Sequence, residues 1–479
     1  MDDHRRHLIR GFNWLGSAAI LARIIDFSTI LAVLLFLTKE QVGIASLVVS
    51  FGMVVEAFNG LGTSEALVQT PSVNRLQLDT LFWFVLAAGA LAGVLTLLAA
   101  PWIATVYGVS GMAVYFLAIA IKQPIVAAAV IPLAILNRDL QYERIAVVSV
   151  CATAIAALTR LGLAVAGAGA WAIVAGYAVS GLCTLIGAFL AKPFRPGLRF
   201  RMPAISPLLH FGLRAATSNI FEQVFKNVDY LLIGWFYGAA PLAVYRVAFD
   251  VAMEPAMAVG TLVNRTALPV FAKLASARDA LAQALTWSLG RLSILVFPLM
   301  AGLILAADPL TSLLHDGQGR SYAAAALPLK LLAAAALLRV TSQLLYPLMM
   351  GSGRPGAAAR LSATTLALLT IGILVAGFSF RAGDGIIAMA GVWFAVYPLL
   401  LVWAIRYVWR NWRIRAFELA RALILPGGGI ATLVLMVMIA RLLPLSSDPR
   451  VELGLVIGAT ALTYGGLFFL ARRRPEPAA

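Results

Sequence analysis

Acidic and basic side chains recur inside segments that are otherwise apolar, and the densest group lies between Phe221 and Pro255. Within it, Glu222, Lys226 and Asp229 are spaced i, i+4 and i+7, which places all three on one face of a helix. Inserting a charge near the centre of a membrane helix costs about 2.5–3.5 kcal/mol, so its retention indicates a partner or a water-filled cavity.

The following segment repeats this pattern with Arg246, Asp250 and Glu254. Because the Gly-Ala-Ala-Pro connection is short, we expect two antiparallel neighbouring helices, with Asp229 and Arg246 at a similar depth about 12 Å below the outer loop. Two interpretations stay open for this group. The charges neutralise one another as a buried packing network, or they line a hydrated cavity between two halves of the protein that meets a charged substrate or a coupling ion.

Another pair, Arg23 and Asp26, is spaced i, i+3 on the first helix and can face the same cavity from the other half. An excess of cations at depth favours an anionic cargo, because the planar donor fork of arginine suits phosphate oxygens. We predict that the cations bind pyrophosphate: Arg23, Lys226 and Arg246. We predict that the acidic residues carry a coupling proton or sodium ion, or pair with these cations: Asp26, Glu222, Asp229, Asp250 and Glu254.

Two prolines, Pro255 and Pro269, flank the predicted end of the helix that carries Arg246. Proline removes a backbone hydrogen bond and bends or ends a helix, so Pro255 is predicted as a hinge, with a plain helix end as the alternative. Other cations near helix ends are expected to extend their charged heads into water. Ten basic residues fall within or near the ends of the predicted crossings: Arg23, Lys122, Arg160, Arg214, Lys226, Arg246, Arg291, Lys330, Arg339 and Arg421.

The composition indicates that a membrane surrounds these charges. Of 479 residues, 61% are hydrophobic and 12% are charged, against about 25% charged in a soluble domain, which excludes a water-soluble enzyme. The net charge of +16 comes from scattered basic residues, so we expect no nucleic-acid partner and attribute the charge to membrane topology and anionic lipids. Alternate loops hold 22 and five Lys and Arg, which predicts that both termini are cytoplasmic.

The apolar segments predict an all-α integral membrane protein with about 14 transmembrane helices. We expect an N-terminal lobe over 1–200, a C-terminal lobe over 201–410, and two additional helices with a basic cytoplasmic tail over 411–479. The similar spacing of Arg23 to Asp26 and of Lys226 to Asp229 supports two pseudo-symmetric six-helix lobes. The helices are predicted near 12–37, 41–60, 79–106, 109–136, 144–167, 170–191, 208–236, 240–264, 283–306, 324–350, 357–380, 384–405, 417–440 and 451–471.

Several common site motifs are missing from the sequence. No Gly-Lys-Ser/Thr phosphate cradle occurs, so we expect no direct ATP hydrolysis, and no HExxH or GxSxG motif indicates an enzyme. Cys151 and Cys183 lie apart in apolar runs, which indicates neither a disulfide framework nor a metal site. We expect no cofactor and no metal, and we expect the glycines at 427–429 to allow close helix packing.

Four stretches resemble a known family: FNGLGTSEALVQ at 58–69, NRDLQYERIA at 137–146, KNVDYLLIGWFYG at 226–238 and LAVYRVAFDVAMEP at 242–255. The chain resembles Wzx-type polysaccharide flippases, especially the colanic-acid-exporter-like branch of the multidrug/oligosaccharidyl-lipid/polysaccharide exporter superfamily. The resemblance implies a non-enzymatic flippase with two lobes around a central cavity, in the bacterial cytoplasmic membrane. It also implies that a polyprenyl-pyrophosphate-linked oligosaccharide moves between leaflets by alternating access, for lipopolysaccharide or exopolysaccharide export. Its implied partners are this substrate, membrane lipids and the polysaccharide polymerase or export machinery.

Two other function classes compete with the one that this resemblance implies. An ion-coupled multidrug exporter of the same superfamily would bind amphipathic cations and favour acidic cavity residues, whereas the candidate set here is rich in cations. A membrane polymerase or ligase commonly has a large external loop, and the longest predicted outer loop, Asp308 to Ser321, is short.

Overall fold

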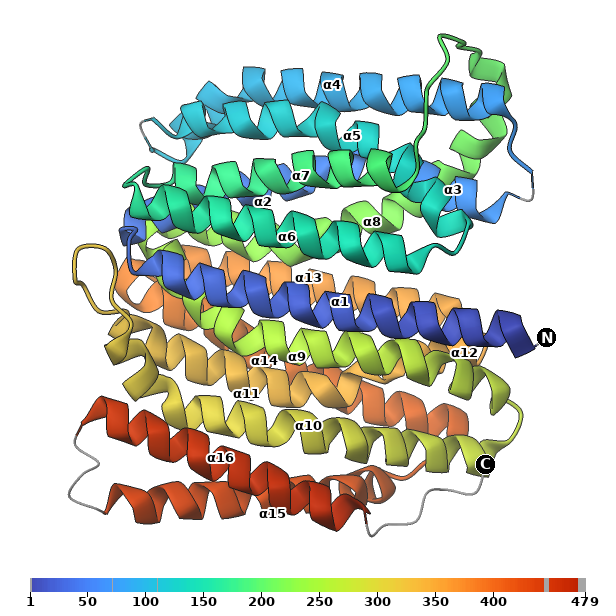
Figure 1. Cartoon of the computed structure of the whole chain (residues 1–479). Coiled ribbons are helices and arrows are strands. Elements are labelled where there is room, and N and C mark those ends of the chain that lie inside the picture. Colours follow the sequence, from blue (N-terminus) through green and yellow to red (C-terminus); the bar gives the residue numbers. More distant parts are fainter. Residues whose placement is uncertain (1, 71, 110, 443–447, 473–479) are drawn as a thin grey trace. The chain divides into compact units, whose positions relative to one another are not determined.

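The computed structural model describes residues 2–70, 72–109, 111–442 and 448–472, and the regular elements within those ranges are helices (Figure 1). The predicted basic tail at 473–479 lies outside the described residues. The chain divides into two compact units, each described by itself below. Unit 1 comprises Met1–Ala243 with Asp316–Gln318, and unit 2 comprises Val244–His315 with Gly319–Ala479.

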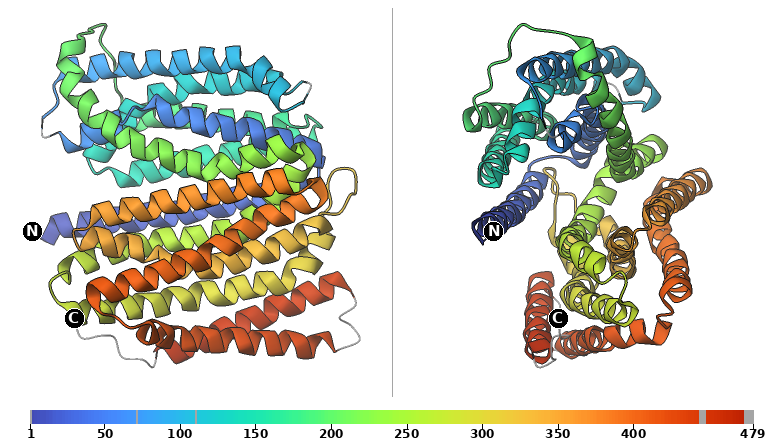
Figure 2. Two further views of the ribbon diagram at one scale, coloured as in Figure 1. Left: turned by 180° about the vertical axis from the view of Figure 1, so that it is seen from behind. Right: turned by 90° about the vertical axis from the view of Figure 1, so that its right-hand side faces the viewer.

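Unit 1 is a helix bundle in which α2 contacts α4, α5, α7 and α8, while α1 packs on α6 and α6 packs on α7. The helices run side by side, as the end-on view in Figure 2 shows. A cluster of buried apolar residues that includes Leu81, Ile131 and Phe194 joins α4, α5 and the segment after α7. The helices are α1 (Asp2–Leu34), α2 (Lys39–Asn59), α3 (Thr63–Gln69), α4 (Arg75–Val106), α5 (Phe116–Arg138), α6 (Tyr142–Val165), α7 (Trp171–Ala191) and α8 (Met202–Tyr237), with a 3₁₀ turn at Met112–Tyr115.

Local sequence explains where these helices begin and how closely they pack. Thr38 caps α2 and exchanges backbone and side-chain hydrogen bonds with Gln41, which satisfies donors that the first helical turn leaves free. Asn74 and Gln77 form the same arrangement at the start of α4. Along α4, a side chain at Gly93 would collide with the carbonyl of Ala120 on α5, so glycine permits the close contact between these helices.

Unit 2 is a second bundle, in which α10 packs against α11, α15 and α16, and α14 packs against α11 and α13. A buried cluster that includes Ala301, Leu433 and Val456 joins α10, α15 and α16. The helices are α9 (Ala239–Lys273, whose first turn belongs to unit 1), α10 (Arg278–Leu313), α11 (Ala326–Gln343), α12 (Leu345–Gly351), α13 (Pro355–Ser379), α14 (Ala382–Trp412), α15 (Ala416–Arg441) and α16 (Pro449–Arg472), with a 3₁₀ turn at Ala323–Ala325.

Helix boundaries differ from the sequence prediction at several places, including α8, α9 and α11. α9 continues through Pro255 and Pro269 to Lys273 instead of ending near residue 264, so the plain helix end is wrong. Proline is tolerated inside membrane helices because neighbouring groups satisfy the carbonyl that it leaves free. The predicted helix 324–350 divides into α11 and α12 at Leu344, and α8 begins at Met202 instead of near 208.

Eleven helices within the described residues are long and apolar enough to cross a membrane, and α8, α9 and α11 are not among them. The protein is therefore an all-helical, multi-pass membrane protein. Many of the residues exposed on its surface are large and apolar, as expected of a surface that faces lipid.

Candidate functional site

Unit 1 contains a buried ion pair that three separate helices build. Lys122 on α5 places its Nζ atom 2.7 Å from Oε2 of Glu56 on α2. The hydroxyl of Tyr177 on α7 donates to the same oxygen at 2.5 Å, and the ammonium lies 3.2 Å from the centre of the tyrosine ring. The Lys122 side chain is 4% exposed, so the charge is stabilised by its carboxylate and by the ring face instead of by water.

Glycines on two of these helices make room for the cluster. Gly181 lies one turn after Tyr177 on α7, and a Cβ atom there would come within 2.9 Å of Cε of Lys122. Gly52 lies one turn before Glu56 on α2, and a Cβ atom there would lie 3.1 Å from the Tyr177 ring. The absence of these two side chains lets the lysine lie between α5 and α7.

A second polar contact lies one turn further along α2. Nδ2 of Asn59 donates to Oε1 of Gln123 at 2.5 Å, and the two residues are 1% and 0% exposed. Within the described part of the chain, Oδ1 of Asn59 and Nε2 of Gln123 have no hydrogen-bond partner. Because Gln123 follows Lys122 directly, α2 and α5 present a continuous polar strip to each other.

A further ion pair in unit 1 includes one of the predicted residues. Asp26 on α1 lies 2.5 Å from the guanidinium of Arg160 on α6, with side chains 34% and 14% exposed. Gly176 on α7 faces the stem of Arg160, where a Cβ atom would collide with it. Asp26 therefore has an ion-pair partner on a neighbouring helix, while Arg23 lies exposed one turn earlier on α1.

The three predicted charges on α8 have different surroundings. Nζ of Lys226 lies 2.6 Å from Oε1 of Glu222, and these side chains are 50% and 61% exposed. Asp229 is 1% exposed, and its Oδ1 accepts the backbone N–H of Tyr230. Glu222 and Lys226 form an accessible pair, and Asp229 is enclosed.

α8 is also held near its C-terminal end by Tyr107, which follows α4. The Tyr107 hydroxyl donates to the carbonyl of Leu231 at 3.1 Å. Burial raises the pKa of Tyr107 to about 12, so the phenol keeps its proton and remains a donor at physiological pH.

In unit 2, the predicted residues all lie on α9. Nε of Arg246 is 3.2 Å from Oδ2 of Asp250, and the side chains are 18% and 14% exposed. Glu254 and Pro255 follow one turn later and are partly buried. Because Arg246 and Asp229 belong to different units, their predicted pairing stays a prediction.

Sequence analysis did not select the residues of the buried cluster in unit 1. Lys122 and Arg160 were recognised as cations within crossings, but nothing local indicated their partners. The available signal was Glu56, the single acid between Val42 and Asn59 on α2. In unit 2, Arg339 on α11 was likewise not selected, and it interacts electrostatically with Tyr397 on α14.

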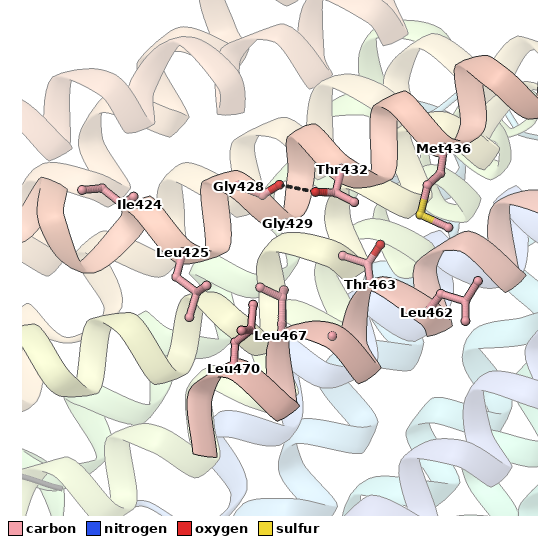
Figure 3. Close-up of a pocket in the computed structure, with 11 residues that line it drawn as sticks. Ile424, Leu425, Gly428, Gly429, Thr432, Met436, Leu462, Thr463, Leu467 and Leu470 are labelled. Carbon is pink, nitrogen blue, oxygen red and sulfur yellow. Dashed lines mark hydrogen bonds between the residues drawn. The ribbon is translucent and has the colours of Figure 1, made fainter. Parts of the chain in front are cut away.

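A cavity of about 460 Å³ lies between α15 and α16 in unit 2 and carries no charged residue in its lining (Figure 3). Its wall includes Gly428 and Gly429, and a Cβ atom at Gly429 would come within 2.7 Å of Leu467. Gly429 therefore permits close packing of the two helices, as the sequence predicted, whereas a Cβ atom at Gly427 or Gly428 would meet nothing within 4 Å. Among the described residues, no group of three His, Cys, Asp or Glu side chains could hold a metal ion.

The model of the polysaccharide biosynthesis protein family matches residues 30–322, which include Lys226 and Arg246. The chain belongs to this family. Among its relatives, the Escherichia coli K12 lipopolysaccharide biosynthesis protein WzxC is 24% identical over 361 residues, with 73% of this chain and 71% of the relative covered. The Rhizobium meliloti succinoglycan biosynthesis transport protein ExoT is 23% identical over 419 residues, with 88% and 83% covered.

The fold of this protein is similar to that of solved transporter structures. The lipid II flippase MurJ, in an inward closed conformation, matches with a TM-score of 0.76 at 11% identity, over 96% of this chain and 99% of MurJ. A multidrug resistance MATE family transporter of the MOP superfamily matches with a TM-score of 0.61 at 14% identity, over 84% and 96%. The family resemblance drawn from four sequence stretches is confirmed as membership of the polysaccharide biosynthesis protein family, with WzxC among the relatives.

Proposed function

We propose that this protein is a flippase that moves a polyprenyl-pyrophosphate-linked oligosaccharide across the cytoplasmic membrane by alternating access, for cell-surface polysaccharide biosynthesis. The observation that carries the proposal is membership of the polysaccharide biosynthesis protein family across residues 30–322. The fold supports the same conclusion, because MurJ, whose structure is similar, is a lipid II flippase.

The pyrophosphate end of the substrate would meet the cations Arg23, Lys226 and Arg246. Lys226 is the most accessible ion-paired member, at 50% side-chain exposure, and its contact with Glu222 can be exchanged for a phosphate at small cost because the pair is exposed. Arg246 is held by Asp250, which would fix the direction of its guanidinium. The carboxylates Asp26, Asp229 and Glu254 are proposed to pair with cations or to carry a coupling ion.

The proposed placement has 14 crossings, both termini in the cytoplasm, and the bacterial inner membrane as the location. Lobes over 1–200 and 201–410 would enclose the substrate path, and 411–479 would add two helices. α9 would bend at Pro255, where the proline leaves the carbonyl of Val251 without its helical hydrogen bond. The polymerase and export machinery would receive the flipped product.

A multidrug exporter of the same superfamily is the competing function. The fold does not separate the two activities, because a MATE transporter also matches it. The family model and the accessible cation Lys226 favour an anionic cargo.

Reconstitution separates these functions. Proteoliposomes would receive a short-chain polyprenyl-pyrophosphate oligosaccharide, and its movement between leaflets would be measured with and without a proton or sodium gradient. We expect protein-dependent movement, which a gradient of the coupling ion accelerates. Failure to move several glycans, together with gradient-driven efflux of a cationic dye, would establish the exporter instead.

A further inference from the structure

The segment 192–201, here called the basic loop, connects α7 to α8 and has a fixed conformation. Oδ1 of the buried Asp79 accepts the N–H of Gly197 at 3.0 Å, and the indole N–H of Trp83 donates to the Gly197 carbonyl at 2.9 Å. A Cβ atom at Gly197 would lie 2.6 Å from Oδ2 of Asp79, so the loop needs glycine at this contact. The Phe194 side chain is buried in the apolar cluster of unit 1.

Beyond that anchor, the basic loop turns apolar and cationic side chains outward together. Leu198 is 91% exposed and Phe200 is 57% exposed. Arg199 lies between them and Arg201 follows, and both are exposed. Among the described residues, no salt bridge includes Arg199 or Arg201. The exposed face of the basic loop therefore combines apolar and cationic side chains. Such a face suits an environment that offers both apolar groups and anions.

The position of the basic loop identifies those surroundings. The loop lies where α7 ends and α4 begins, and both helices are long and apolar enough to cross a membrane. More cations gather at the same end of unit 1, where Arg144 donates to the Ala191 carbonyl and Lys192 pairs with Asp139. The connections at the opposite end, 107–115 and 166–170, contain no Lys or Arg. Cations at one end of membrane helices attract acidic lipid headgroups.

We propose that the basic loop is a membrane-interface anchor, in which Leu198 and Phe200 enter the acyl boundary while Arg199 and Arg201 bind phosphates of anionic phospholipids. The anchor fixes this end of unit 1 at a constant depth in the leaflet. The assignment of that leaflet as cytoplasmic rests on the proposed function, whereas lipid binding by the loop does not.

The test uses the full chain with Cys151→Ser, Cys183→Ser and Leu198→Cys, labelled with bimane and reconstituted in phosphatidylcholine vesicles. Phosphatidylglycerol or phosphatidylcholine that carries a doxyl quencher near the headgroup is then added. We expect doxyl-phosphatidylglycerol to quench at a several-fold lower mole fraction than doxyl-phosphatidylcholine. Arg199→Gln and Arg201→Gln should each reduce this preference about fivefold.

The matched control places the label at Ala166→Cys, an exposed position in the 166–170 connection, which contains no Lys or Arg. There we expect equal quenching by both lipids. Quenching of the Leu198→Cys label by aqueous iodide but by neither lipid would overturn the anchor and favour a soluble acidic partner. Equal quenching of the Leu198→Cys label by the two lipids would show that Arg199 and Arg201 do not select anionic phospholipids. Neither readout depends on transport, so the flippase proposal is tested separately.

Discussion

Two Lys–Glu pairs in unit 1 have nearly the same geometry and different surroundings. Lys122 and Glu56 are 2.7 Å apart, join two helices, and have side chains 4% and 30% exposed. Lys226 and Glu222 are 2.6 Å apart, lie one turn apart on α8, and are 50% and 61% exposed. By the distance between nitrogen and oxygen alone, the two pairs are equivalent.

Burial decides what each lysine can do. Breaking a buried pair leaves a charge without water and costs about 3–5 kcal/mol. An exposed i, i+4 pair contributes about 0.3–0.5 kcal/mol, so its lysine can exchange the carboxylate for another anion. Lys122 therefore holds helices together, and Lys226 is available to a ligand.

The largest expected effect is that of Glu56→Gln. The change removes the charge that stabilises Lys122, so we expect a loss of about 3–5 kcal/mol in stability and little folded protein in the membrane. Thermal unfolding and size-exclusion yield of detergent-purified protein measure this. Glu56→Gln combined with Lys122→Met should recover much of the loss, because no charge then stays buried. A single variant as stable as wild type would show that the pair has no structural role.

Lys226→Gln should lower transport about 10- to 150-fold while the abundance of folded protein stays unchanged. The reason is the loss of a charge-assisted hydrogen bond to phosphate, which is worth about 1.5–3 kcal/mol. Initial rates in proteoliposomes measure the effect, and Lys192→Gln, whose side chain pairs with Asp139 at 35% exposure, is the matched control. Equal transport rates for the two variants would show that Lys226 does not bind the substrate.

Gly181→Ala should destabilise the protein by about 1–3 kcal/mol, because the new methyl group overpacks the site that holds Lys122. The shift appears in the thermal unfolding midpoint. Gly162→Ala on α6 is the control, since nothing lies within 4 Å of a Cβ atom there. If the two variants unfold alike, the space around Lys122 is looser than the structure indicates.

Glu222→Gln should have the smallest effect on stability, about 0.3–0.5 kcal/mol, because its partner remains hydrated. Transport by the Glu222→Gln variant is the more informative measurement. If Glu222 competes with the substrate for Lys226, the variant should bind the anionic headgroup, and transport it, at least as well as wild type. A loss of transport equal to that of Lys226→Gln would indicate that the pair acts as a unit.

The sequence was sufficient to predict an all-helical membrane protein, its family, and the proximity of Glu222 to Lys226, because hydropathy and i, i+4 spacing are local signals. The pair of Glu56 and Lys122 joins positions 66 residues apart, and no periodicity connects them. The partner of Asp26 was missed for the same reason, since Arg160 lies 134 residues away. The continuation of α9 past residue 264 and through Pro269 was missed because neighbouring helices decide whether a proline ends a membrane helix.

The separation of Glu56 from Lys122 also sets a condition on biogenesis. Ribosomes add about 5–20 residues per second, so roughly 3–13 s pass between synthesis of the acid and synthesis of the cation 66 residues later. During that interval Glu56, three residues before the end of α2, has no Lys122 to pair with. The insertion machinery therefore handles α2 before the cation that pairs with its acid has been made, and the pair forms only when α5 arrives.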